Sequence, residues 1–287
     1  MVAVTTCGVI SLYASAGLSL ALTAALILGG LSVAAVGLWD DVRSAPIAAR
    51  IAVHVGAAVL AVYCLGGATA IRAGEFVFDL GGVGLILSVL AIVWTLNLFN
   101  FMDGIDGIAA SEAAFILLGA AGLSFFFGGS SPAELAPALV AGGASLGFLK
   151  WNWPPARIFM GDIGSGYLGY VIAVLAIESA KTSAVNVYAW LILGGVFLVD
   201  ATITLCRRLL RRERVYQAHR THAYQWLARR WGSHSSVTIA VIAIDLIWLL
   251  PCAALAVKFP ASALWICIVA LAPLAVCTLL SGAGRPE

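Results

Sequence analysis

Ten long runs of apolar residues, separated by short polar segments, fill most of the 287-residue chain. A helix needs roughly 20 mostly apolar residues to cross a bilayer, and each run approaches that length, although the shortest could be partly re-entrant. Lipid cannot satisfy an open backbone, so the pattern predicts an all-α polytopic membrane protein, with about ten transmembrane helices in one domain over residues 1–287. The runs cover residues 1–18, 20–38, 48–66, 82–101, 108–127, 135–150, 164–180, 185–206, 237–257 and 261–281.

The composition and the basic residues add an orientation to this picture. Hydrophobic residues make up 62% of the chain, charged residues make up 10%, and the mean hydropathy is +1.03, which excludes an ordinary soluble domain. If the loop after residue 38 is cytoplasmic, 13 of the 16 lysines and arginines fall in cytoplasmic segments, as the positive-inside rule requires. We therefore expect residues 39–47, 102–107, 151–163 and 207–236 to face the cytoplasm.

The acids and histidines gather on this same predicted face. Ionisable groups at a membrane boundary are expensive unless they are solvated or paired, so a one-sided collection indicates a shared site. The alternative is that each acid is an ordinary solvated residue at a helix end, which explains any single acid better than the whole set. The residues concerned are Asp40, Asp41, Asp103, Asp106 and Asp162, with His219, His222 and His234.

The stretch NLFNFMDGIDG places Asn97, Asn100, Asp103 and Asp106 three residues apart at the end of an apolar run. On a helix this spacing brings the four side chains near one another, and the two Asp-Gly pairs permit an abrupt turn. Amide and carboxylate oxygens can bind a hard cation or hydrogen-bond a polar heterocycle, and Mg²⁺ takes only one or two protein oxygens besides substrate phosphates. A polar helix cap is the alternative, but a cap does not require the two asparagines inside the apolar run.

Two further motifs carry acids at helix ends. Asp40 and Asp41 directly follow an apolar run, and because adjacent carboxylates repel, the pair indicates a cation or a positioning role. Arg50 comes ten residues after Asp40 and can hold a phosphate, or can be a positive-inside anchor. Asp162, between glycines in FMGDIGSG, is either a plain helix cap or marks a helix start whose N–H groups face an anion.

The loop AHRTHAYQ carries His219, Arg220 and His222 in a strongly basic segment, and such side chains suit a pyrophosphate. Zinc is disfavoured because a single HxxH pair is present, with no cysteine nearby. Asp200, in the preceding apolar run, is interpreted as structural and paired with a neighbouring polar group or an arginine. His54, alone on an apolar helix, is interpreted as a packing residue.

Taken together and in this order, the four motifs resemble the polyprenyl-phosphate N-acetylhexosamine-1-phosphate transferase superfamily, glycosyltransferase family 4. The histidine loop is most similar to that of the bacterial O-antigen and capsule branch. The resemblance runs from residue 1 almost to the end of the chain. It rests on Asp40-Asp41, on Asn97-x-x-Asn100-x-x-Asp103-Gly-x-Asp106-Gly, on Phe-Met-Gly-Asp162-x-Gly-Ser and on the loop with His219 and His222.

The resemblance implies a Mg²⁺-dependent phosphoglycosyl transferase, with Mn²⁺ as a substitute ion. A UDP-N-acetylhexosamine would give its sugar-1-phosphate to undecaprenyl phosphate and release UMP, which starts a cell-surface polysaccharide. The enzyme would lie in the bacterial inner membrane with its site facing the cytoplasm, and it would not bind nucleic acid. Family members are often dimers, so a homodimer is compatible with the resemblance, and the donor sugar stays open because such selectivity rests on a few pocket contacts.

The resemblance also implies roles for individual residues. The implied metal ligands are Asn100 and Asp162. The implied catalytic residues are Asp40, Asp41 and Asp103, with the first two positioning the lipid phosphate. The implied substrate-binding residues are Arg50, Asn97, Asp106, His219, Arg220 and His222, with Asp106 on the uracil. A phosphate monoester has its second pKa near ~6 and is already mostly dianionic at pH 7, so direct attack needs no base. Asp40 is the candidate if a base acts.

Two alternatives and one departure from the family remain at this point. A cation-coupled membrane transporter would place ionisable groups near mid-membrane in mirrored halves. A CDP-alcohol phosphatidyltransferase would carry a DGxxAR motif, whose arginine DGIDGIAASEA lacks. Family members have another helix and a Pro-Thr-Pro-x-x-Gly-Gly-like segment before the first run, so we expect an upstream extension, and a stop codon just before Met1 in the genome would contradict it.

Overall fold

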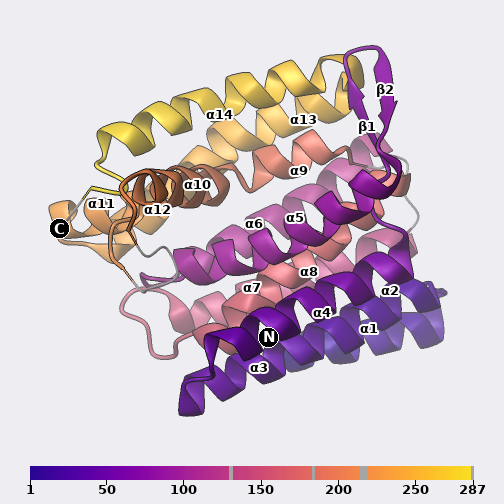
Figure 1. The fold of residues 1–287 in the computed structure, drawn as a ribbon, viewed down its shortest axis with the longest axis horizontal. Helices are drawn as coiled ribbons and strands as arrows, with labels where there is room; N and C mark the ends of the chain where they lie inside the picture. Colours follow the sequence, from indigo (N-terminus) through magenta and orange to yellow (C-terminus); the bar gives the residue numbers. More distant parts are fainter. Residues whose placement is uncertain (129–131, 183–184, 214–218, 286–287) are drawn as a thin grey trace.

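The computed structural model describes residues 1–128, 132–182, 185–213 and 219–285 and shows a bundle of long helices. Helices α1 to α4 lie along one side of the bundle and α13 and α14 along the other, with α5 to α9 between them (Figure 1). All ten predicted apolar runs are helical in their described parts, which confirms the all-α polytopic class. The first helices are α1 (Val2–Ala16), α2 (Leu20–Ala24), π-helix η1 (Ala25–Gly29), α3 (Gly30–Arg43), α4 (Ile47–Leu65) and α5 (Gly81–Met102).

The second half of the chain continues in the same manner. Its helices are α6 (Ile108–Leu123), π-helix η2 (Ser124–Gly128), α7 (Pro132–Asn152), α8 (Gly161–Thr182), α9 (Val187–Leu193), α10 (Gly195–Leu210), α11 (Ala223–Trp231), α12 (His234–Ile244), π-helix η3 (Asp245–Leu249), α13 (Leu250–Lys258), the 3-10 turn η4 (Pro260–Ser262) and α14 (Ala263–Leu280).

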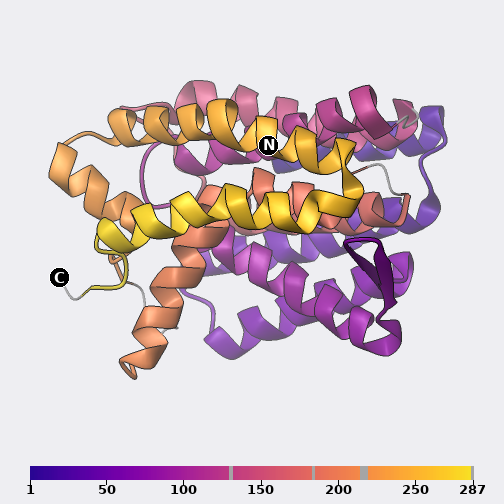
Figure 2. The same cartoon turned by 90° about the horizontal axis from the view of Figure 1, so that it is seen from above.

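The number of membrane spans is not confirmed at ten. Seven helical segments of the described chain are long and apolar enough to cross a membrane, and α9 with α10 makes an eighth if that pair, bent by 79°, is one span. The bend falls at Gly194 and Gly195, and Figure 2 shows α10 turning away from the common direction of the bundle. The segment at α1 is a shorter apolar helix of 15 residues.

A β-hairpin that the sequence pattern did not predict joins α4 to α5. Strands β1 (Ala70–Ala73) and β2 (Phe76–Asp79) pair antiparallel, with Ala70 opposite Asp79. Each strand has only four residues and none of these residues is buried, with all four of β2 exposed, so the strands are too short and too open to give the pattern of a half-buried strand. The hairpin lies at the opposite end of the bundle from the C-terminus (Figures 1 and 2).

Local capping explains where several helices begin. Ser19 accepts a hydrogen bond from the Leu22 N–H at the start of α2, Asn186 accepts one from Ala189 in α9, and Ser233 accepts one from Ser236 in α12. A capping side chain satisfies one of the N–H groups that the first helical turn leaves without partners. Helices α8 and α11 receive these acceptors from other parts of the bundle, as described below.

Two glycines let α3 and α5 pack closely against α8, the central helix of the site. Gly37 of α3 faces the backbone of Asp162, where an added Cβ would lie 2.6 Å from the carbonyl oxygen. Gly169 of α8 faces α5, where an added Cβ would lie 2.6 Å from the Thr95 carbonyl oxygen. Small residues let helix backbones approach closely in membranes, so α3 and α5 pack tightly on α8 and carry their polar ends to one place.

Gly169→Ala is expected to lower the free energy of unfolding by about 1–3 kcal/mol, because the new Cβ meets backbone atoms of α5 that no side-chain rotation can move. The matched control is Gly56→Ala on α4, where nothing lies within 4 Å of the new Cβ. Thermal unfolding in detergent measures both variants. Equal unfolding midpoints for the two variants would contradict the close packing of α8 on α5.

Candidate active site

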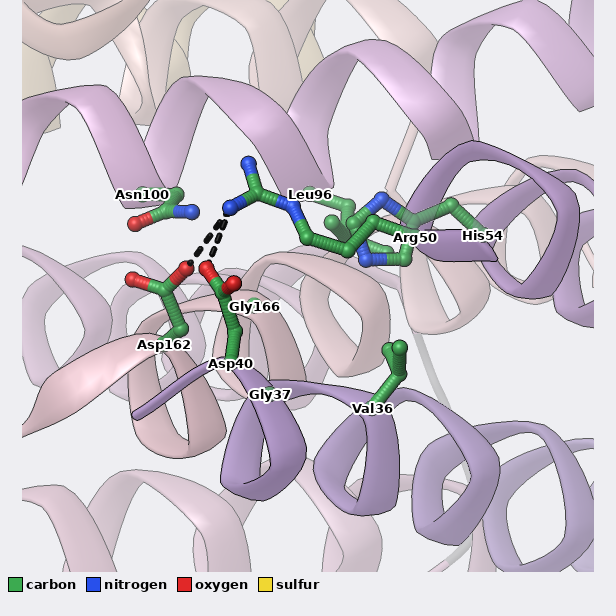
Figure 3. Close-up of a pocket in the computed structure, with 9 residues that line it drawn as sticks. All are labelled: Val36, Gly37, Asp40, Arg50, His54, Leu96, Asn100, Asp162 and Gly166. Carbon is green, nitrogen blue, oxygen red and sulfur yellow. Dashed lines mark hydrogen bonds and ion pairs between the residues drawn. The ribbon is translucent and has the colours of Figure 1, made fainter. Parts of the chain in front are cut away.

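Four helix ends bring their polar residues together at one end of the bundle. Asp40 comes from the end of α3, Arg50 from the start of α4, Asn100 from the end of α5 and Asp162 from the start of α8, and Figure 3 shows them facing one another. They line a cavity of about 10 Å³, roughly the space of one water molecule. The cavity is also lined by His54, which the sequence indicated only as a packing residue.

Arg50 is the cation of this cluster and lies between two carboxylates. Its Nη1 pairs with Oδ2 of Asp40 and lies 3.5 Å from Oδ2 of Asp162 (Figure 3). The other oxygen of Asp40 accepts the Ala45 N–H at 2.7 Å. Because the side chain of Arg50 is 29% exposed, a further anion can reach its guanidinium from outside the cluster. Its predicted role at a phosphate therefore has a structural basis, with two acids as its present partners.

Asp41 caps α8 from the neighbouring helix. Its Oδ1 accepts the Asp162 N–H at 3.0 Å, and its Oδ2 accepts the Ile163 N–H at 3.2 Å. Gly161 at the start of α8 has φ +63, and a Cβ there would lie 2.5 Å from Asp41 Oδ2, so a glycine is required on both counts. The negative charge also suits the helix N-terminus. Asp162 itself does not act as the plain cap that the sequence left open; its side chain faces Arg50.

The two asparagines of α5 have different surroundings. Asn100 lies beside Asp162 at the cavity, and its Oδ1 accepts a hydrogen bond from Ser165 Oγ at 3.5 Å. Asn97 donates through Nδ2 to the Val93 carbonyl of its own helix at 2.7 Å, and it does not line the cavity. The three-residue spacing thus predicts a shared end of the helix, but only Asn100 reaches the cluster. The substrate-binding role of Asn97 stays a prediction.

Asp103 ends α5 next to the cluster. Burial raises the pKa of Asp103 to about 7, together with the negative charges of Asp162 and Asp41. In the described part of the chain its carboxylate has no hydrogen-bond or ion-pair partner. A cation placed among these acids would relieve the same repulsion.

Asp106 holds the turn after α5 to two other segments. Its Oδ2 accepts the Ala156 N–H at 3.1 Å, and its carbonyl oxygen accepts the Thr238 hydroxyl of α12 at 3.0 Å. His234 Nδ1 lies 3.5 Å from Asp106 Oδ1 and is a neighbour that the sequence indicated only by its place on the same face. The uracil role of Asp106 stays a prediction, and any uracil contact would share the carboxylate with these donors.

The histidine loop packs on the end of α5. The rings of His219 and His222 are stacked with centroids 4.9 Å apart, and His222 also stacks on Phe101 at 6.3 Å. Tyr224 donates its hydroxyl to the Phe101 carbonyl at 3.1 Å. The loop therefore reaches the neighbourhood of Asp103, as the predicted shared site requires, while residues 214–218 of its approach lie outside the described residues.

The ionisable residues of this loop differ in their surroundings. Burial lowers the pKa of His219 to about 4, and the nearby His222 and Arg208 lower it as well, so His219 is neutral at pH 7 and offers hydrogen bonds rather than charge. Arg220 is exposed, and its carbonyl oxygen accepts a hydrogen bond from the guanidinium of Arg229 at 2.9 Å. Asp200 of α10 lies under the loop and accepts the Ala223 and Tyr224 N–H groups, which confirms its interpretation as a paired, structural residue.

A buried carboxyl pair lies outside this cluster, and the sequence analysis did not identify it. Glu112 of α6 and Asp245 of η3 are both 0% exposed and their side chains lie against one another. No described residue gives either carboxyl a well-formed hydrogen bond. The signal available from the sequence was a single acid inside each of two apolar runs, which is rare and costly in a membrane.

The donor atoms of the cluster fit a hard cation. Among the described residues, no group of three or more His, Cys, Asp or Glu side chains is arranged to hold a metal ion. Asn100 and Asp162 instead offer an amide and a carboxylate oxygen side by side. Mg²⁺ commonly takes one or two protein oxygens and completes its shell with water and phosphate oxygens, so this donor set suits it.

The fold and the cluster define a polytopic membrane protein with a carboxylate-rich site at one end of its bundle. Residues 23–180 match the glycosyl transferase family 4, and because this match covers more than half of the chain, the protein belongs to that family, as predicted. The matched region carries Asp40, Arg50, Asn100 and Asp162 but not the histidine loop.

Individual relatives agree with this family. The chain is 28% identical to a probable undecaprenyl-phosphate N-acetylglucosaminyl 1-phosphate transferase of Bacillus subtilis over 233 residues, 78% of this chain and 63% of that protein. It is 39% identical over 131 residues to the phospho-N-acetylmuramoyl-pentapeptide-transferase of Shouchella clausii, covering 46% of this chain and 38% of that protein. The corresponding transferase of Chlamydia muridarum is 35% identical over 143 residues, 47% of this chain and 40% of that protein. The chain therefore spans less than two thirds of the length of these relatives.

Asp41→Ala is expected to lower the free energy of unfolding by about 0.5–2 kcal/mol, because two N–H groups at the start of α8 lose their acceptor. Asp41→Asn keeps one acceptor oxygen and should lose less. Thermal unfolding in detergent compares both with Glu75→Ala, which removes an exposed carboxylate at the hairpin turn. The capping role is wrong if Asp41→Ala unfolds at the same temperature as Glu75→Ala.

Proposed function

We propose that this chain transfers an N-acetylhexosamine-1-phosphate from a UDP-sugar to undecaprenyl phosphate and releases UMP. The product would be a polyprenyl-diphosphate-linked sugar that initiates a cell-surface polysaccharide. The observation that carries the proposal is the convergence of Asp40, Arg50, Asn100 and Asp162 from four helices, in a chain of glycosyl transferase family 4. Phosphoryl transfer relies chiefly on positioning and charge neutralisation, and such a cluster supplies both.

The names of the relatives support the substrate classes. The Bacillus subtilis relative is named for undecaprenyl phosphate and for an N-acetylglucosaminyl 1-phosphate group, and the Shouchella clausii relative for a phospho-N-acetylmuramoyl group. Both sugars are N-acetylated, which favours an N-acetylhexosamine donor for this chain. The histidine loop AHRTHAYQ supports the O-antigen and capsule branch, and the basic residues on its side of the bundle support a cytoplasm-facing site in the inner membrane.

Asn100 and Asp162 are the residues that would hold Mg²⁺, and the ion when bound neutralises charge on the phosphates. Arg50 adds a positive charge between Asp40 and Asp162, where it can bind a phosphate oxygen of either substrate. Asp40 is held by Arg50 and by the Ala45 N–H, so it orients Arg50 rather than standing free as a base. The acceptor phosphate is already mostly dianionic at pH 7, since its second pKa is near ~6, and it can attack directly.

The bundle also offers apolar space for a lipid tail. A cavity of about 560 Å³ lies between α5, α8, α9 and α10, and residues of the hairpin also line it. Its walls are mostly apolar and include Leu98, Phe99, Ile172 and Phe197. Phe99 neighbours Asn100 in the chain, so the cavity begins close to the polar cluster. A prenyl chain has the chemistry that such a cavity accommodates.

One specific observation favours the transporter alternative, namely the buried pair Glu112 and Asp245. Acids inside a membrane bundle often mark an ion path. Asp245 lies on η3, outside the family match, and neither Glu112 nor Asp245 is among the residues that line the four-helix cavity. We therefore favour the transferase, and an assay of the chemistry separates the two functions.

The assay combines purified protein, undecaprenyl phosphate, Mg²⁺ and a panel of UDP-N-acetylhexosamines, and it measures UMP release. We expect release with one donor, its loss with EDTA, and recovery with added Mg²⁺ or Mn²⁺. Asp162→Asn should lower the rate by at least about 100-fold, because it removes a charge from the proposed metal site. Glu75→Gln, an exposed carboxylate at the hairpin, is the matched control and should keep the parent rate.

A longer form that carries the N-terminal segment typical of the family is tested in parallel, since this chain spans 63% of its Bacillus subtilis relative. No UMP release from either form with any donor would contradict the transferase. UMP release that persists in EDTA would contradict the proposed requirement for a metal ion.

A further inference from the structure

Asp200 is a buried carboxylate that the proposed chemistry does not use directly. It is 3% exposed on α10, and burying a charge is costly unless donors surround it. Its Oδ1 accepts the Ala223 N–H at 2.9 Å and the Thr204 hydroxyl at 3.0 Å, and its Oδ2 accepts the Tyr224 N–H at 3.0 Å. These two N–H groups open α11, so Asp200 caps this helix from α10, beside the capping box that the side chains of His222 and Gln225 form.

The same carboxylate faces the ring of His222. His222 is 1% exposed, and its Nδ1 lies 3.4 Å from Asp200 Oδ1. Nδ1 has no well-formed hydrogen bond within the described chain, so Asp200 is the acceptor within its reach. Stacking on His219 and on Tyr224, at 4.9 and 5.8 Å between centroids, fixes the plane of the ring. A carboxylate only accepts hydrogen bonds, so a hydrogen bond to Asp200 requires a proton on Nδ1, whereas accepting the Gln225 N–H in the capping box requires a ring nitrogen without one.

We infer that Asp200 is the positioning residue of the histidine loop: it anchors the start of α11 and holds His222 as the Nδ1–H tautomer. The other ring nitrogen, Nε2, then carries no proton in the neutral ring and is a hydrogen-bond acceptor. A carboxylate behind a histidine commonly sets the orientation and basicity of the ring in this way.

The consequence for catalysis rests on the proposed function, in which the histidine loop contacts the pyrophosphate. Phe101, against which His222 stacks, lies between Asn100 and Asp103 in the chain. A small rotation of the His222 ring would therefore affect the position of residues at the end of α5. The loop has a second anchor, because the Gly284 N–H donates to the Thr221 carbonyl at 2.7 Å, so losing Asp200 need not release the loop.

The first test is independent of turnover. In protein labelled with ¹⁵N-histidine, the four histidines give separate side-chain signals, and a His222→Asn variant assigns those of His222. We expect the Nδ1 of His222 to be protonated in the parent protein and the Nε2–H tautomer to increase in Asp200→Asn. A parent protein with His222 as the Nε2–H tautomer would overturn the inference, whatever the activity of the enzyme.

The second test is kinetic. Asp200→Asn should lower kcat for UMP release by at least about tenfold, with little change in the KM for the UDP-sugar. Thr204→Val removes only the hydroxyl donor to Asp200, so it should keep the tautomer and lower kcat less. Asp245→Asn removes a buried carboxyl that does not face the loop, and it should keep the parent kcat.

An equal loss of kcat in Asp200→Asn and Asp245→Asn would assign the effect to general destabilisation. An equal loss of kcat in Asp200→Asn and Thr204→Val would do the same, and either result would overturn the inference. Parent-level kcat in Asp200→Asn would overturn it as well. If the parent protein releases no UMP, the proposed function fails, while the ¹⁵N experiment still decides the role of Asp200.

Discussion

The constraint on which this structure depends is that the first N–H groups of a helix need acceptors that the helix itself does not provide. A carboxylate from a neighbouring helix supplies them here, both at the exposed start of α8 and at the buried start of α11. At α8 the acceptor is Asp41 of α3, and at α11 it is Asp200 of α10. Both acids therefore tie two helices together, and in doing so they fix Asp162 and His222. Part of the one-sided collection of acids is thus structural, and the site is built on it.

The remaining charges of the cluster are unbalanced without a further cation. Asp40, Asp103 and Asp162 meet a single guanidinium, Arg50, which already contacts two of them. Burial and the neighbouring carboxylates raise the pKa of Asp103, which reports the same excess of negative charge. A divalent cation with phosphate ligands would restore the balance, and the amide of Asn100 supplies a neutral oxygen donor beside Asp162. The electrostatics thus favour a site that is completed by its substrates.

The sequence predicted the class of fold, because apolar runs and polar helix ends follow directly from hydropathy. It predicted the family because the four polar motifs resemble that family in their residues and order. It did not predict which neighbour each side chain would meet. Periodicity shows that Asn97 and Asn100 share a region of α5, yet Asn97 bonds its own helix while Asn100 faces α8. The short hairpin and the bend between α9 and α10 carry too few residues for a periodic pattern. The pairing of Glu112 with Asp245 depends on a contact between distant segments, which no local pattern contains.

The most direct test of the central claim is electron paramagnetic resonance of Mn²⁺ bound to the protein, with and without a UDP-N-acetylhexosamine. The account predicts that the nucleotide sugar strengthens Mn²⁺ binding, that the bound ion shows coupling to phosphorus, and that Asn100→Ala and Asp162→Asn abolish both effects. Glu75→Gln should leave the spectra unchanged. Mn²⁺ binding that is indifferent to the nucleotide sugar, or equal in Asp162→Asn and in the parent protein, would contradict a metal and phosphate site between α5 and α8.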